Sequence, residues 1–86
     1  MARILIVEDS PTQAMSLTRL LKKHGHEVLT AKDGAEGIEV AKAELPDLVL
    51  MDVVMPKING FQATRQITKD PSTRHIPVII VTTWGV

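Results

Sequence analysis

Three acidic residues directly follow the most apolar stretches of this chain, and their types and spacing could do chemistry. Glu8 and Asp9 come after the apolar run 4–7, and Asp52 comes after the apolar run 48–51. Adjacent carboxylates repel each other, so the pair costs stability unless a cation lies between them. Mg²⁺ prefers carboxylate and carbonyl oxygens together with several water molecules. The pattern therefore predicts a magnesium site formed by Glu8, Asp9 and Asp52.

Asp52 is the candidate nucleophile of such a site. A carboxylate can attack a phosphoryl group and form an acyl phosphate, and phosphoryl transfer mainly needs in-line placement and neutralisation of oxygen charge. The hydroxyl of Thr82, which follows another apolar run, can donate a hydrogen bond to a phosphoryl oxygen. Simpler interpretations remain open. Glu8 and Asp9 suit the start of a helix, Asp52 suits a turn, and threonine is common in strands.

Composition limits the possible functions. The 86 residues suffice for one small domain, with 44% hydrophobic and 23% charged residues. Ten basic and ten acidic residues give zero net charge, so no basic field is available to bind nucleic acid or an anionic membrane. Cysteine is absent, which excludes disulfides and thiolate metal sites and fits a cytoplasmic location. No segment resembles a signal peptide or reaches the roughly 18 apolar residues of a membrane span.

Four segments are predicted to form strands, at residues 3–7, 27–31, 47–52 and 77–82. Three of them are continuously apolar, which is typical of strands covered on both faces. The segment 27–31 is more mixed in polarity and suits the edge of a sheet.

Three helical patterns separate these strands. The first begins at Ser10 and Pro11 and ends before Gly25, the second begins near Asp33, and the third extends from about Asn59 to Asp70. Their expected buried residues are Ala14, Leu17, Leu20 and Leu21 in the first helix, Ala35, Ile38 and Ala41 or Val40 in the second, and Phe61, Ile67, Thr68 and Thr64 or Ala63 in the third. Such alternation predicts a parallel sheet in an α/β fold, with the polar strand ends meeting at one edge.

Several stretches carry a resemblance to a known family. ILIVEDS, DLVLMDVVMPKINGF and IPVIIVTT resemble the motifs of response-regulator receiver domains, the CheY-like phosphoacceptors of two-component systems. KKHGHEVLTAKDGAEG and GFQATRQITKD are most similar to small stand-alone receivers of the pilus-motility (PilH) type. The resemblance implies a receiver domain at 1–83, a non-family tail at 84–86, and a flavodoxin-like parallel sheet of order 2-1-3-4 with helices on both faces.

The resemblance also implies a role for particular residues. Glu8 and Asp9 match the acid pair that holds Mg²⁺ directly or through water, and Asp52 matches the aspartate that is phosphorylated by a histidine kinase. Val54 matches a position whose backbone carbonyl binds the metal, and Thr82 matches the hydroxyl that turns towards the phosphoryl group. The expected partners are a histidine kinase and a downstream protein, and the expected catalysis is limited to self-phosphorylation and dephosphorylation.

The chain departs from the family pattern in one respect. It lacks the family's last helix, strand and helix, and no lysine follows Lys69 to match the family's phosphoryl-binding lysine. An open strand edge and an uncovered sheet face then predict a homo-oligomer, a swapped dimer or one half of a split domain. The alternative function is a non-switching receiver fragment that acts as an interaction or assembly module. A phosphohydrolase is a weaker third hypothesis, because Asp52-Val53-Val54 has no second acid two residues on.

Overall fold

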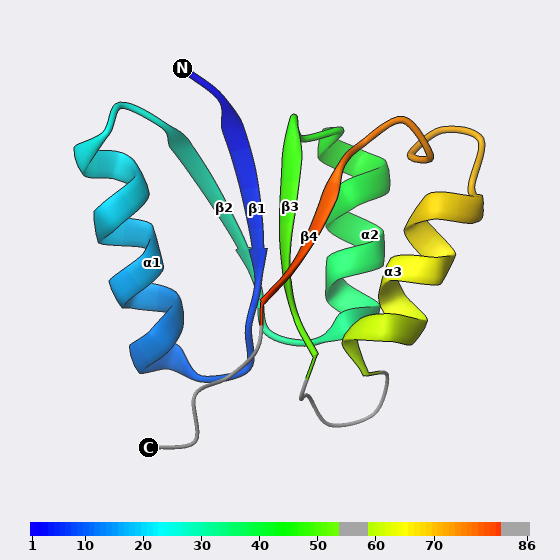
Figure 1. Ribbon diagram of the computed structural model, residues 1–86, viewed down its shortest axis with the longest axis horizontal. Coiled ribbons are helices and arrows are strands. Elements are labelled where there is room, and N and C mark those ends of the chain that lie inside the picture. The colour runs from blue at the N-terminus through cyan, green and yellow to red at the C-terminus, as the bar shows by residue number, and fades with distance from the viewer. Residues whose placement is uncertain (54–58, 82–86) are drawn as a thin grey trace.

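One parallel sheet organises the chain (Figure 1). The computed structural model describes residues 1–53 and 59–81, and within these the sheet has four strands in the order β2-β1-β3-β4. The strands are β1 Arg3–Val7, β2 Glu27–Ala31, β3 Leu48–Asp52 and β4 Val78–Val81. This confirms the predicted flavodoxin-like order, places β2 at an edge, and makes β4 the other edge within the described residues.

Two of the strands are slightly shorter than predicted. Asp47 lies outside β3, and its carboxylate accepts a hydrogen bond of 2.8 Å from the backbone N–H of Arg3. Pro77 precedes β4, and its carbonyl accepts a hydrogen bond from the N–H of Val49. Thr82, predicted as the last residue of the fourth strand, lies outside the described residues.

Side-chain caps define where the helices begin, as the sequence predicts. The helices are α1 Pro11–Lys23, α2 Gly34–Glu44 and α3 Gly60–Lys69. Their N-cap residues Ser10, Asp33 and Asn59 each accept a hydrogen bond from the backbone N–H three residues further on. No helix among the described residues is both long enough and apolar enough to span a membrane.

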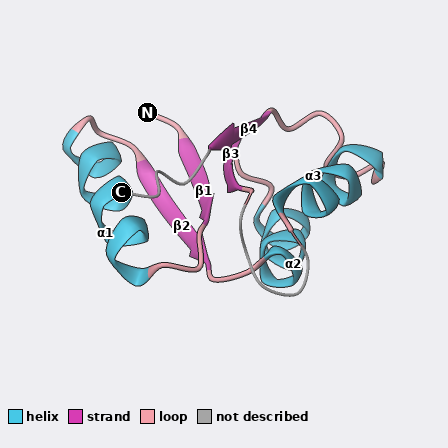
Figure 2. Cartoon of the chain, turned by 60° about the horizontal axis from the view of Figure 1, so that its bottom comes forward, coloured by secondary structure: helices cyan, strands magenta, loops and turns pink. Residues whose placement is uncertain are grey.

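The helices lie on both faces of the sheet, with α1 on one face and α2 and α3 on the other (Figure 2). The main apolar cluster lies between the sheet and the α2–α3 pair. It consists of Leu5, Val7, Ala31, Val49 and Met51 from the strands, Ala41 from α2, Ala63 and Ile67 from α3, and Ile76 from the following loop. The two faces are therefore unequal, because α1 has no buried residue.

The buried faces of the helices differ from the prediction at four positions. Thr68 of α3 is exposed, because it follows the buried Ile67 and is turned away from the sheet. Phe61 is 62% exposed, because α3 buries Gly60, Ala63 and Ile67, and the next residue after Gly60 is turned away by about 100°. Ala35 is also exposed, because α2 buries Gly34, Gly37 and Ala41 instead. Leu20 is 52% exposed. Its helix, α1, contacts mainly β1 and β2. No described helix covers β3 and β4 on this face.

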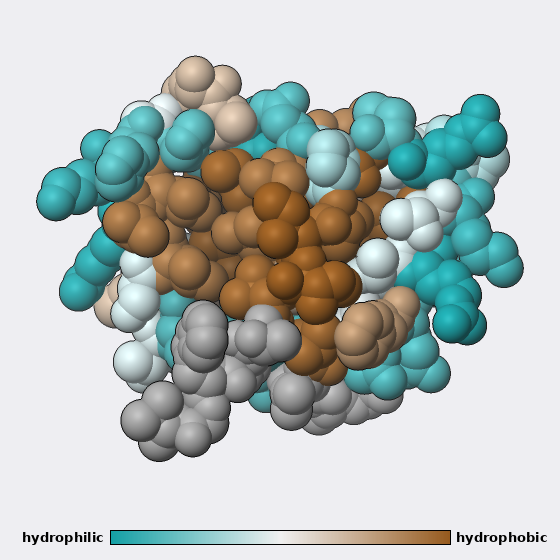
Figure 3. All heavy atoms as spheres, viewed as in Figure 1, coloured by the Kyte–Doolittle hydropathy of each residue, from teal (hydrophilic) through white to brown (hydrophobic). Residues whose placement is uncertain are grey.

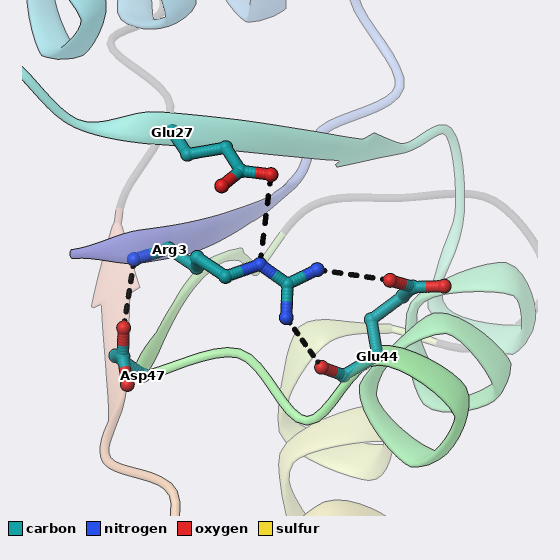
Figure 4. Close-up of polar contacts among 4 residues, drawn as sticks. All are labelled: Arg3, Glu27, Glu44 and Asp47. Atoms are coloured by element: carbon teal, nitrogen blue, oxygen red, sulfur yellow. Dashed lines mark hydrogen bonds and ion pairs between the residues drawn. The ribbon is translucent and has the colours of Figure 1, made fainter.

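Arg3 links β1 to β2 and α2 at the end of the sheet that is opposite to the acidic residues (Figure 4). Its guanidinium donates to the backbone carbonyl of Glu44 at 2.8 Å and to the carboxylate of Glu44 at 2.9 Å. The same guanidinium lies 3.6 Å from the carboxylate of Glu27. Because Glu44 ends α2, Arg3 satisfies one of the carbonyls that a helix terminus leaves without an intrahelical partner.

We expect Arg3→Met to lower the free energy of unfolding by about 1 kcal/mol, because it removes a carbonyl contact and two half-exposed ion pairs. Chemical denaturation monitored by circular dichroism measures this loss. Arg19→Met is the matched control, because Arg19 lies exposed on α1. An equal loss in both variants would contradict the assigned role of Arg3.

Candidate functional site

Three carboxylates meet at the carboxyl end of the sheet. One oxygen from each of Glu8, Asp9 and Asp52 can be chosen such that all three lie within 4.8 Å of one another. Glu8 is 6% exposed and Asp52 is 3% exposed, whereas Asp9 is exposed to solvent. The structure thus brings together the acids that the sequence singled out, two of them buried and the third open to water.

The pairing of the central strands explains this meeting. β1 and β3 are parallel neighbours, and Val7 is in register with Met51. Glu8 follows the last residue of β1 and Asp52 is the last residue of β3, so the two lie side by side at this end of the sheet. The backbone N–H of Glu8 also donates to the carbonyl of Ala31 at 3.0 Å, which continues the pairing with β2 and fixes the direction of the chain at Glu8.

The charge of Glu8 is costly in this position. Burial raises the pKa of Glu8 from 4.5 to about 7, and the negative charges of Asp52 and Asp9 and a side-chain hydrogen bond with Asp52 act in the same direction. The backbone N–H of Ser10 opposes this shift by donating to the Glu8 carboxylate at 3.0 Å. A cation at the cluster would relieve both the repulsion and the cost of burial.

Gly60 allows α3 to begin close to the end of β3. Its N–H donates to the carbonyl of Val53 at 3.3 Å. A Cβ at this position would overlap the backbone carbonyl oxygen of Asp52 and approach the Cα of Val53 to 2.7 Å. The sequence pattern predicts only that a helix begins near Asn59. The need for glycine at position 60 depends on the short distance between β3 and α3, which a local sequence pattern does not reveal.

The chemistry of the cluster fits a hard divalent cation. All three ligand groups offer carboxylate oxygens, and Mg²⁺ keeps several of its own water molecules. Glu8 and Asp9 also line a cavity of about 220 Å³ together with residues of β2, α1 and α2. This space, to which Asp52 does not contribute, leaves room for water beside the acid pair.

Two of the predicted site residues cannot be placed. Val54, expected to offer its carbonyl, and Thr82, expected to offer its hydroxyl, lie outside the described residues. Their roles stay predictions.

Comparison with known proteins decides the family. The model of the response regulator receiver domain matches residues 4–86. The chain belongs to the response regulator receiver family. This receiver is 65% identical over 83 residues to protein PilH of Pseudomonas aeruginosa, a match that covers 96% of this chain and 69% of PilH. Receiver domains are regulatory phosphoacceptor domains of two-component signalling.

Solved receivers share the fold. The N-terminal domain of a response regulator receiver protein from Methanoculleus marisnigri is 36% identical, with a TM-score of 0.94 over 100% of this chain and 70% of that one. The receiver domain of a sensor histidine kinase from Pseudomonas aeruginosa is 32% identical, with a TM-score of 0.88 over 92% of this chain and 65% of that one. That structure has a magnesium ion coordinated in its active-site cleft.

The raised pKa of Glu8 predicts a pH-dependent stability in metal-free buffer. Between pH 4.5 and about 7 the folded receiver binds more protons at Glu8 than the unfolded chain does. The free energy of unfolding therefore falls as the pH rises through this window, by about 2–3 kcal/mol. Urea denaturation at a series of pH values with a chelator present measures the change.

The control for this experiment is Glu8→Gln, which has no proton to exchange at this position. We expect its stability to change less over the same window, and to exceed that of the wild-type chain at pH 7. Parallel pH profiles of the two proteins would contradict the assigned shift.

We expect Gly60→Ala to destabilise the receiver by about 1–3 kcal/mol, because α3 must move away from the end of β3 to make room for the methyl group. Thermal unfolding measures the loss. Gly25→Ala is the comparison: its Cβ has open space, so only the positive φ of +86° is unfavourable there. A Gly60→Ala variant as stable as the wild type would contradict the observed close approach.

Proposed function

We propose that this receiver accepts a phosphoryl group on Asp52 in a Mg²⁺-dependent reaction, with a histidine kinase as the donor. The observation that carries the proposal is the meeting of Glu8, Asp9 and Asp52 in a chain of the receiver family. Glu8, Asp9 and Asp52 offer carboxylate oxygens to the metal, and Val54 offers its backbone carbonyl. Thr82 donates its hydroxyl to a phosphoryl oxygen.

The transfer needs little covalent help from the protein. An oxygen of the Asp52 carboxylate attacks phosphorus, the bond between phosphorus and the kinase histidine breaks, and the nitrogen keeps the electron pair. The product is an acyl phosphate on Asp52. Burial of Asp52 at 3% exposure holds its carboxylate at the end of β3 and away from bulk water.

Bound Mg²⁺ would neutralise negative charge on the phosphoryl oxygens. Glu8 and Asp9 have a positioning role in this scheme, because they hold the ion beside Asp52 without taking part in bond formation. Glu8 is fixed for this task by the N–H of Ser10, and Asp9 is exposed to the solvent from which the ion arrives. In this scheme the Thr82 hydroxyl assists the metal by donating to a phosphoryl oxygen.

A second candidate function is supported by the apolar surface. Ile79 and Ile80 of β4 are 50% and 36% exposed, and Met15 and Leu20 of α1 are more than half exposed. A surface of this kind favours binding to another protein segment. The chain would then act as an interaction or assembly module, whether or not Asp52 is phosphorylated. The predicted self-association into an oligomer or swapped dimer is one form of this function and stays a prediction.

The similarity to PilH suggests the setting of the signal. We propose a cytoplasmic role in pilus-based twitching motility, with a downstream protein that distinguishes the phosphorylated from the unphosphorylated receiver.

Intact-mass measurement tests the phosphoacceptor function. On incubation with Mg²⁺ and acetyl phosphate we expect a gain equal to one phosphoryl group, and we expect Asp52→Asn to abolish it, because an amide cannot act as the nucleophile. Removal of Mg²⁺ by a chelator is also expected to prevent the gain.

The matched control is Asp47→Asn, because Asp47 lies at the opposite end of the sheet, where it accepts a hydrogen bond from Arg3. This variant should gain the phosphoryl mass as the wild type does. No gain in the wild-type chain, under conditions in which a full-length receiver reacts, would contradict the proposal and favour the interaction module. A gain that survives Asp52→Asn would exclude Asp52 as the acceptor.

A further inference from the structure

The cavity beside the acid pair has a third carboxylate in its wall. Its volume is about 220 Å³, and it lies where β1 and β2 lead into α1 and α2, at the lower end of the sheet in Figure 1. Besides Glu8 and Asp9, the residues that line it include Glu36 of α2 and Lys32 of the connection before α2. The charge of Glu36 therefore faces the same space as the acid pair.

Charged side chains elsewhere on the sheet lie away from this cavity. Figure 3 shows apolar side chains gathered over the strands on the face towards the viewer, with hydrophilic residues around the margin. At the end of the sheet opposite to the acid pair, Arg3 pairs with Glu27 and Glu44. The charges in the cavity wall are thus the ones that face an ion held by the acid pair.

Two hydrogen bonds hold Glu36 in the cavity wall. Its backbone N–H donates to the carboxylate of Asp33, the N-cap of α2, at 2.8 Å. Its Oε1 accepts from the backbone N–H of Lys32 at 3.0 Å, which turns the side chain back towards the end of β2. Both contacts are typical of a helix start. They leave Oε2 without a hydrogen bond from any described residue, so this oxygen can accept one from water.

Glu36 does not belong to the direct ligand set. Among the described residues, the acids whose oxygens all lie within 4.8 Å of one another are Glu8, Asp9 and Asp52. Mg²⁺ keeps several of its own water molecules when carboxylates bind it. The cavity has room for such waters, because one water needs only about 10–15 Å³ of accessible space. An acceptor in the cavity wall can then stabilise the hydrated ion without contacting the metal.

We propose that Glu36 is a positioning residue of the metal site, where its carboxylate accepts hydrogen bonds from the water around bound Mg²⁺. Its negative charge also adds to that of the acid pair, whereas Lys32, a cation in the same wall, has the opposite effect on the affinity for the ion. This inference rests on the proposed Mg²⁺-dependent function and deepens it, because it identifies residues that set the affinity of the site.

Calorimetric titration of the 86-residue chain with MgCl₂, without any phosphodonor, tests the inference. We expect Glu36→Gln to weaken Mg²⁺ binding about tenfold, at the lower end of the effects typical of groups that surround a metal site without contacting the metal. The amide oxygen of Gln can still accept the hydrogen bond from Lys32, so the substitution removes mainly the charge. Lys32→Gln is expected to strengthen binding about twofold, because it removes the cation from the cavity wall.

The matched control is Glu39→Gln, which removes the same charge about one turn further along α2. Glu39 is exposed and is not among the residues that line the cavity. An ionic strength of about 0.1 M limits the reach of exposed charges to about 10 Å. We expect the dissociation constant of Glu39→Gln for Mg²⁺ to match that of the wild type. Circular dichroism and urea denaturation establish that each variant is folded.

Three results would overturn the inference. They are an unchanged dissociation constant in Glu36→Gln, an equal loss of affinity in Glu39→Gln, and a Lys32→Gln variant that binds Mg²⁺ no more tightly than the wild type. A Glu36→Gln chain that is less stable but binds Mg²⁺ normally gives the first result, and would limit Glu36 to capping α2. If Glu36→Gln does not fold, Lys32→Gln decides.

The proposed function fails in a different way. A wild-type chain that binds Mg²⁺ but gains no phosphoryl group on Asp52 would contradict the phosphoacceptor function and leave the role of Glu36 intact. A wild-type chain that binds no Mg²⁺ would overturn both.

Discussion

Electrostatic repulsion among three carboxylates at the carboxyl end of the sheet is the constraint on which the functional interpretation depends. Glu8 and Asp52 are almost fully buried, and oxygens of these two residues and of Asp9 lie within 4.8 Å of one another. Burial of the Glu8 carboxyl, together with the negative charges of Asp52 and Asp9, raises the pKa of Glu8 to about 7. Without a cation, the protein must keep a proton at this site or lose stability. A bound cation would relieve the repulsion among the three carboxylates and the cost of burying their charge.

The rest of the fold holds the acids in place against this repulsion. β1 lies between β2 and β3, and the register of β1 with β3 puts the residues after Val7 and Met51 side by side. The apolar cluster beneath α2 and α3 fixes these strands, and Arg3 fastens the opposite end of β1 to the end of α2. The face covered by α1 is less well packed, because α1 has no buried residue.

Much of this arrangement could be predicted from the sequence. Glu8, Asp9 and Asp52 each follow a continuous apolar run, and in a parallel sheet the ends of such runs meet at one edge. The helix starts at Ser10, Asp33 and Asn59 were predictable because a cap is a local interaction.

The features that escaped prediction are those that depend on distance rather than on residue type. Phe61 was expected to face the sheet because it is apolar, but its angular position on α3 turns it outward. The need for glycine at position 60 arises from its approach to the backbone of Asp52. The raised pKa of Glu8 similarly results from burial and from neighbours 44 residues apart in sequence, which no local pattern contains.

The most direct test of the account is a calorimetric titration of the wild-type chain with Mg²⁺, with Asp52→Ala measured in parallel. The account predicts one ion bound per chain, an increase in the free energy of unfolding on binding, and a large loss of affinity when the Asp52 carboxylate is removed. Absence of Mg²⁺ binding at millimolar concentration, or binding that is unchanged in Asp52→Ala, would contradict it.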